Sequence, residues 1–187
     1  MPHMILTKDV YLNKALSVIL QQSSVDRRVC IVDIESFRSL GAILRVLKRK
    51  KLTEEQRLIF IGGKDVSSRV LEPLVTINRK SCYTEFRKQI TDGRVCSPEN
   101  TLNYIARFRS LSILSVRERK TLFALIEIYD TKEVAGKIQL SPKSVYGYIS
   151  NIGKKLNLSS IIQVRQFIFS EFTQDAETGE SGSRTSR

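Results

Sequence analysis

Two hydrophobic patterns divide the chain. Up to about residue 93, short apolar runs alternate with segments in which apolar positions recur every three or four residues. The runs Val29–Ile34 and Leu58–Ile61 are almost continuously apolar, which is typical of strands buried on both faces of a parallel sheet. From residue 111 to residue 172 the helical spacing alone is present. The pattern predicts an α/β domain followed by an all-α domain.

The first pattern predicts a small parallel sheet covered by helices, because strands that alternate with helices form right-handed crossovers. The expected strands are Met4–Thr7, Val29–Ile34, Leu58–Ile61 and the weaker Val75–Asn78. The expected helices are Asp9–Gln21, Ser36–Lys51, Asp65–Leu71 and Tyr83–Thr91. A flavodoxin-like sheet has one strand more, so one strand–helix unit is missing between Gln22 and Val29.

Four segments follow from these patterns. We predict an α/β domain at 1–93, a linker at 94–110, a helical domain at 111–172 and a disordered tail at 173–187. Ser97-Pro98-Glu99-Asn100 is a turn signal within the linker. The tail is polar and rich in small residues, a composition that does not form a packed core.

Capping signals mark the helices of the second domain. Ser115-Val116-Arg117-Glu118 fits a capping box, in which the hydroxyl and the carboxylate each accept a hydrogen bond from a backbone N–H. It predicts a helix over residues 116–128, and Asp130 opens a second, shorter helix. Ser141 followed by Pro142 predicts the start of a third helix, because proline is tolerated at the first helical position.

The third predicted helix, Pro142–Leu156, has two different faces. One carries the apolar stripe Val145, Ile149, Ile152 and Leu156. The opposite face has no carboxylate and consists of Lys143, Tyr146, Gly147, Ser150, Asn151 and Lys154. Side chains three and four residues apart lie together, and such a face fits a DNA major groove about 12 Å wide. A solvated polar helix face is the alternative interpretation.

Charge and composition narrow the function. The net charge of +12 favours a polyanionic partner such as DNA, although charge alone does not separate DNA from RNA or an acidic membrane. No apolar run approaches the ~20 residues of a membrane span, and no signal-peptide pattern opens the chain. We therefore expect a cytoplasmic protein with no membrane partner.

The sequence has few residues of the kinds that commonly bind metals or act in catalysis. The cysteines Cys30, Cys82 and Cys96 are widely spaced, and His3 is the single histidine. Zinc sites need clustered Cys and His ligands, and no nucleophile, base and orienting group stand together in the sequence. We expect reduced thiols, no catalytic residue, no metal and no cofactor, so the protein is not expected to be an enzyme.

Residues Leu114–Leu156 resemble, without a gap, the helix-turn-helix of LuxR/NarL-type transcription regulators. The positions that carry the resemblance are Leu114-Ser115, Arg117-Glu118, Leu122, Lys132-Glu133-Val134-Ala135, Ile138, Leu140-Ser141, Ser144-Val145, Asn151-Ile152 and Lys155-Leu156. Three positions depart from the family pattern. Ile128 stands where the family usually has a helix-ending glycine, Tyr148 replaces the usual histidine, and Tyr146 replaces a lysine that contacts bases in many members.

The resemblance implies a four-helix domain that binds double-stranded DNA as a dimer. Carried over by position, it places Tyr146, Gly147 and Ser150 at base edges. Contacts to phosphates position a protein on DNA without specifying sequence. The residues that the resemblance places near phosphates are Lys143, Ser144, Tyr148, Asn151, Lys154 and Lys155. A fourth helix, Ser160–Glu171, would dimerise through exposed Ile161, Val164 and Ile168, unless these residues pack back on their own domain.

Many members of this family carry a receiver domain in front, which is phosphorylated on an aspartate at a strand end. Asp33 resembles that aspartate, and Lys80 lies near the place where receivers keep a lysine. The acidic pair that holds Mg²⁺ after the first strand is replaced by Thr7-Lys8, followed by Asp9, and a lysine there repels the metal. We therefore expect a degenerate, flavodoxin-like receiver.

A similar order of segments, VCIVDIESF, RLIFI, VTINRKSCYTEF and LSILSVRER, resembles the RcsA-like co-activators of the Rcs capsule pathway. This resemblance implies a phosphorylation-independent transcription activator, either a homodimer or a heterodimer with a related response regulator. One alternative is a response regulator switched by phosphorylation of Asp33. The other is an interaction module that modulates another regulator without binding DNA.

Overall fold

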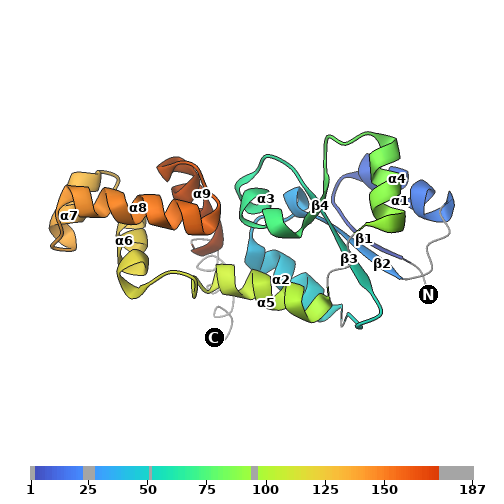
Figure 1. The fold of residues 1–187 in the computed structure, drawn as a ribbon, viewed down its shortest axis with the longest axis horizontal. Helices are drawn as coiled ribbons and strands as arrows, with labels where there is room; N and C mark the ends of the chain where they lie inside the picture. The colour runs from blue at the N-terminus through green and yellow to red at the C-terminus, as the bar shows by residue number, and fades with distance from the viewer. Residues whose placement is uncertain (1–2, 23–27, 51, 94–96, 173–187) are drawn as a thin grey trace, which may run out of the picture. The chain divides into compact units, whose positions relative to one another are not determined.

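The computed structural model describes residues 3–22, 28–50, 52–93 and 97–172 (Figure 1). They belong to two compact units that divide between Arg107 and Phe108. The predicted tail, 173–187, lies outside the described residues, as does Cys96. No helix among the described residues is both long and apolar enough to cross a membrane.

A parallel sheet forms the centre of the first unit. Its described strands are β1 (Met4–Leu6), β2 (Val29–Asp33), β3 (Arg57–Gly62) and β4 (Val75–Asn78). Their spatial order is the chain order, β1-β2-β3-β4, and each neighbouring pair is parallel. A complete flavodoxin-like sheet has the order 2-1-3-4-5. The predicted lack of one strand–helix unit after the first helix therefore explains why β1 lies at the edge.

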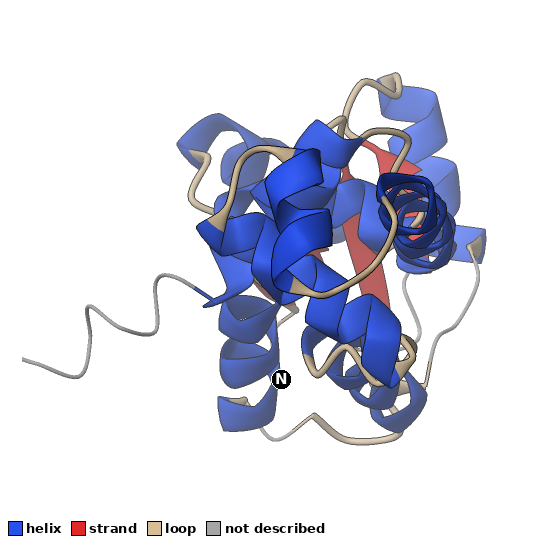
Figure 2. Cartoon of the chain, turned by 90° about the vertical axis from the view of Figure 1, so that its left-hand side faces the viewer, coloured by secondary structure: helices blue, strands red, loops and turns tan. Residues whose placement is uncertain are grey.

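Helices cover both faces of this sheet (Figures 1 and 2). The helices that alternate with the strands are α1 (Val10–Gln22), α2 (Leu40–Arg49), α3 (Val66–Val70) and α4 (Tyr83–Asp92), with short 3-10 turns η1 (Ile34–Ser36) and η2 (Glu72–Leu74). Helix α5 (Pro98–Arg109) follows them and contains the boundary between the two units. Buried side chains of α1 and α4, such as Leu16 and Phe86, pack with Ile31 and Ile59 of the sheet in one core. Strands β2 and β3 are buried along their whole length, as their continuous apolar runs predict.

The segment predicted as a linker contains a helix. Its described part begins at Ser97, and α5 occupies Pro98–Arg109. Ser97-Pro98-Glu99-Asn100, which the sequence indicates as a turn, stands at the start of this helix. Serine before a helix, proline in its first turn and an acidic residue beside it also suit a helix start.

The second unit contains α6 (Val116–Glu127), α7 (Thr131–Lys137), α8 (Pro142–Leu156) and α9 (Ile161–Phe172). The predicted capping box of α6 is present, and Asp130 and Ser141 accept backbone hydrogen bonds that cap α7 and α8. Helix α8 ends at Asn157, whose φ of 56° lies in the left-handed region that asparagine tolerates better than most residues. All four predicted helices are confirmed.

The apolar stripe of α8 is also confirmed. Val145 and Ile149 join residues of α6 and α7 in one buried cluster, and Ile152 and Leu156 are fully buried. Of the two interpretations of the apolar residues on α9, packing back on the domain is correct for Val164 and Ile168, which are fully buried, while Ile161 is half-buried.

Candidate nucleic-acid interface

Every side chain predicted to bind DNA belongs to α8, and burial of the stripe turns most of them outward. Tyr148 is half-buried. The exposed members of the set are Lys143, Ser144, Tyr146, Gly147, Ser150, Asn151, Lys154 and Lys155. The helix contains no Asp or Glu, so its exposed face carries positive charge alone. An outward face of this composition can donate hydrogen bonds to phosphates and to base edges.

Lys155 has a partner inside the domain. Its Nζ lies 2.7 Å from Oε2 of Glu118, which is almost completely buried and also accepts a hydrogen bond from the Ser115 backbone N–H. Burial acts to raise the pKa of Glu118, but the hydrogen bonds from Lys155 and Ser115 outweigh it, so the pKa is lowered. The sequence placed Lys155 near phosphates, whereas the structure directs its ammonium group to the capping box of α6.

An arginine from α9 supports the end of α6. Ile128, at the place of the family's usual glycine, has φ −121° and is extended. Nη2 of Arg165 donates hydrogen bonds to the carbonyl oxygens of Ile128 and Tyr129, and the guanidinium carbon lies 4.3 Å from the Tyr129 ring centroid. The helix end therefore needs no left-handed glycine, because a cation from another helix satisfies its carbonyl groups.

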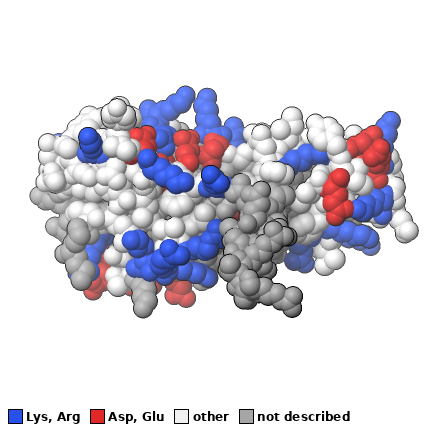
Figure 3. Space-filling model, turned by 180° about the vertical axis from the view of Figure 1, so that it is seen from behind, with Lys and Arg blue, Asp and Glu red and all other residues white. Residues whose placement is uncertain are grey.

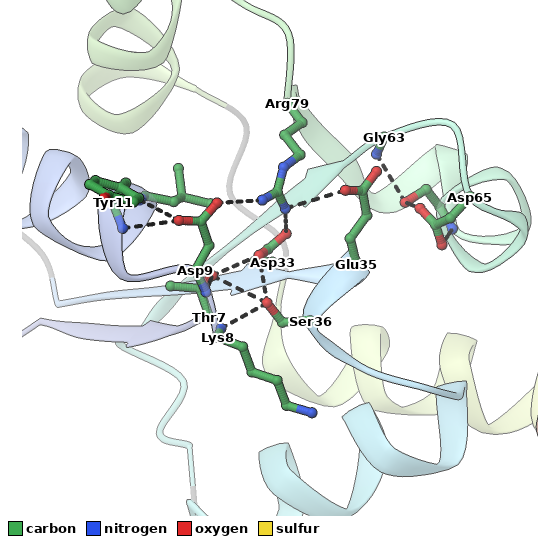
Figure 4. Close-up of polar contacts among 12 residues, drawn as sticks. Thr7, Lys8, Asp9, Tyr11, Asp33, Glu35, Ser36, Gly63, Asp65 and Arg79 are labelled. Atoms are coloured by element: carbon green, nitrogen blue, oxygen red, sulfur yellow. Dashed lines mark hydrogen bonds and ion pairs between the residues drawn. The ribbon is translucent and has the colours of Figure 1, made fainter.

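A second polar cluster lies at the carboxyl edge of the sheet in the first unit (Figure 4). Asp33 is fully buried at the end of β2. Its Oδ2 accepts hydrogen bonds from Thr7 Oγ1 at 2.7 Å and from Ser36 Oγ at 2.6 Å. Its Oδ1 accepts one from Nη1 of Arg79 at 2.7 Å. Both carboxylate oxygens of Asp33, the residue that resembles a phosphorylation site, therefore accept hydrogen bonds from other side chains of the protein.

Arg79 joins three carboxylates. Besides Asp33, its guanidinium contacts Oδ2 of Asp9 at 2.7 Å and Oε2 of Glu35 at 3.4 Å. Burial acts to lower the pKa of Arg79, but the neighbouring carboxylates, Asp33 first, raise it. The pKa of Asp9 is lowered, mainly by a hydrogen bond from the Leu12 backbone. A fixed guanidinium thus supplies positive charge between carboxylates, where a receiver would hold a metal ion.

The interpretation of Lys80 as the receiver-type lysine is not supported by the structure. Lys80 is exposed, while the neighbouring Arg79 reaches Asp33. The Arg79 backbone N–H donates to the Gly62 carbonyl, which extends the β3–β4 pairing by one residue and places this side chain at the sheet edge. Within the described residues no group of three or more His, Cys, Asp or Glu could hold a metal ion.

Residues 112–168 match the family model of the bacterial regulatory proteins of the luxR family. This part of the chain is therefore a LuxR-type helix-turn-helix domain, as its sequence predicted. The Fimbriae Z proteins of Escherichia coli K12 and O157:H7 are each 36% identical to the chain over 83 residues. The match covers 41% of this chain and 40% of each relative, so it spans about two fifths of their length.

Solved structures share the fold of both units. RcsB from Salmonella enterica serovar Typhimurium, bound to promoter P1flhDC, aligns with a TM-score of 0.61 and 17% identity, over 91% of this chain and 98% of that one. A complex of the two-component response regulator RcsB with DNA gives 0.61 and 16% identity, with the same coverage. The fold is therefore a receiver-like α/β domain followed by a helix-turn-helix domain.

The contribution of the ion pair between Arg79 and buried Asp33 to the free energy of unfolding can be measured. Arg79→Met should lower the free energy of unfolding by about 2–3 kcal/mol, because it leaves a carboxylate buried without its cation. Urea unfolding followed by circular dichroism suits a chain without tryptophan. Asp33→Asn in the Arg79→Met background should restore part of the loss, since it removes the unpaired charge. A purely additive double variant contradicts the pairing.

Proposed function

We propose that the chain is a sequence-specific DNA-binding transcription regulator that acts in the cytoplasm. The observation that carries this proposal is α8, which buries one apolar stripe and presents an opposite face free of carboxylates. The luxR family match of residues 112–168 supports it, as do RcsB structures of the same fold that are complexes with DNA. Basic side chains also form several clusters elsewhere on the molecular surface (Figure 3).

We assign the contacts along α8 by position. Tyr146, Gly147 and Ser150 would face base edges. The residues assigned to phosphates are Lys143, Ser144, Tyr148, Asn151 and Lys154. Lys155 would act indirectly, because its ion pair with Glu118 ties the end of α8 to the start of α6. It is therefore a positioning residue in this proposal.

The regulator would work without phosphorylation. Asp33 is enclosed by Thr7, Ser36 and Arg79, so neither carboxylate oxygen is free to attack a phosphoryl donor. The Arg79 guanidinium would also repel a divalent cation from Asp9 and Glu35. Activity would then follow the abundance of the protein or its pairing with a partner.

The partner would be a second copy or a related response regulator. Apolar side chains remain exposed on α9, where Ile162 is 61% and Phe169 62% exposed. Phe123 of α6 is also exposed and meets Phe172 edge-to-face, with ring centroids 5.8 Å apart. These four side chains, the α9 patch, are the apolar surface of the second unit that a twofold partner would cover. The structure of two RcsB dimers bound to two parallel DNAs shares the fold at a TM-score of 0.59.

Substitution of two neighbouring lysines distinguishes a residue that contacts DNA from one that only positions α8. Lys154→Ala should weaken binding to all duplexes and reduce the slope of log affinity against log salt by about 0.9, the effect of losing one phosphate contact. Lys155→Ala should leave that slope nearly unchanged and lower the free energy of unfolding by about 1 kcal/mol, because its partner Glu118 is buried but its own ammonium is half exposed. Fluorescence anisotropy at several salt concentrations measures the slopes.

Lys14→Ala on α1 is the matched control, because it removes one exposed positive charge from the first unit. It should change neither the slope nor the stability. Equal slopes for wild type and Lys154→Ala would contradict the docking of α8. Absence of salt-sensitive DNA affinity in the wild-type chain would instead favour the interaction module.

If the regulator works without phosphorylation, Asp33 should not accept a phosphoryl group. Incubation with acetyl phosphate and Mg²⁺ should add no phosphoryl group by intact mass and should leave DNA affinity unchanged, because the carboxylate is buried and bonded to Arg79. A phosphorylatable receiver protein in the same mixture confirms that the donor is active. A mass gain that Asp33→Asn abolishes would show that the chain is phospho-switched.

The α9 patch predicts the oligomeric state. Ile162→Asp combined with Phe169→Asp should convert DNA-bound dimers to monomers, because two charges would be buried without partners. Sedimentation velocity of complexes with a two-site duplex measures the stoichiometry. Gln21→Asp, an exposed polar position on α1 of the first unit, should leave the dimer intact. Persistent dimers in the double variant would place the contact elsewhere.

A further inference from the structure

A glycine lies at the middle of the outward face of α8. Lys143, Gly147 and Asn151 follow at intervals of four residues, and Lys154 comes three residues later. Residues at these spacings lie above one another on a helix, and all four are exposed. Since Gly147 has no side chain, the ridge that α8 presents has a notch at its centre.

The domain itself does not require this glycine. A Cβ built on Gly147 meets no atom within 4 Å, apart from its chain neighbours and the backbone of its own helix. Gly153 of the same helix differs, because its Cβ would lie 2.7 Å from the carbonyl oxygen of Leu158. A glycine inside a helix costs stability relative to alanine. The cost at Gly147 therefore has no explanation in the packing of the domain.

An aromatic side chain stands beside the notch. Tyr146 is 56% exposed, so much of its ring surface is open to a partner. The next outward residue, Ser150, carries a small hydroxyl group and is exposed. None of Tyr146, Gly147 and Ser150 has the amide or guanidinium group that pairs bidentately with adenine or guanine. The centre of the face therefore presents a small recess and an aromatic ring instead of a bidentate hydrogen-bonding group.

We propose that Gly147 and Tyr146 form a subsite for the 5-methyl group of a thymine. This methyl is the apolar group that a base pair displays in the major groove, and apolar side-chain contact recognises it. The notch lets it approach the helix backbone, and the edge of the Tyr146 ring covers it from one side. The inference rests on the proposed DNA binding by α8 and adds the base chemistry that its centre reads.

The test removes the methyl group and nothing else. A duplex preferred by the full-length chain is first selected from a random library and then resynthesised with uracil in place of each thymine in turn. At one position per half-site, uracil should weaken binding about fourfold, the effect of exposing one buried methyl group. Kd values are measured by fluorescence anisotropy at one salt concentration.

Two glycine variants complete the design. Gly147→Ala fills the notch and should abolish the difference between thymine and uracil at that position. Gly136→Ala is the matched control, because Gly136 on α7 is also a helical glycine whose Cβ would meet nothing within 4 Å. It should keep the fourfold difference.

The outcomes separate the two proposals. Uracil tolerated at every position, or a thymine preference retained by Gly147→Ala, overturns the subsite while salt-sensitive DNA binding remains. A selection that yields no preferred duplex also overturns it. Loss of all DNA binding in the wild-type chain overturns the proposed function itself.

Discussion

Burial of the apolar stripe on α8 is the constraint on which the second unit depends. Val145 and Ile149 enter the cluster formed with α6 and α7, and Ile152 and Leu156 are fully buried farther along the same face. A 15-residue helix held along its whole length by one face has no rotational freedom about its axis. The residues on its other face are therefore fixed outward, whatever their own chemistry. The hydrophobic effect thus orients the polar surface that we propose contacts DNA.

The elements with local signals could be predicted from the sequence. Ser115, Asp130 and Ser141 cap helices within three residues of themselves, and the stripe of α8 repeats within a single helix. The buried strands β2 and β3 were visible as continuous apolar runs. In each of these cases the signal lies within a few consecutive residues, so the sequence indicates a helix cap or a buried face although the residues that pack on that face are distant.

The interactions that escaped prediction connect distant parts of the chain. Arg79 is 46 residues from Asp33, and Lys155 is 37 residues from Glu118. Arg165 reaches the carbonyl of Ile128 across 37 residues. A long cationic side chain carries no sequence signal of the acceptor that it will reach. The nearest clue was the departure of Ile128 from the family's glycine, which required some other group to satisfy the end of α6.

These internal cations change what the net charge means. The value of +12 suggested a surface devoted to a polyanion, but Arg79, Lys155 and Arg165 each neutralise or bond groups of the protein itself. Arg57 is almost completely buried and donates to the carbonyl groups of Ile90 and Thr91 at the end of α4. Cations used in this way fix loops and helix ends in the folded state and release few counterions on binding DNA. Affinity would then come from the exposed lysines Lys143 and Lys154 of α8, and the salt dependence of binding would be smaller than the total charge implies.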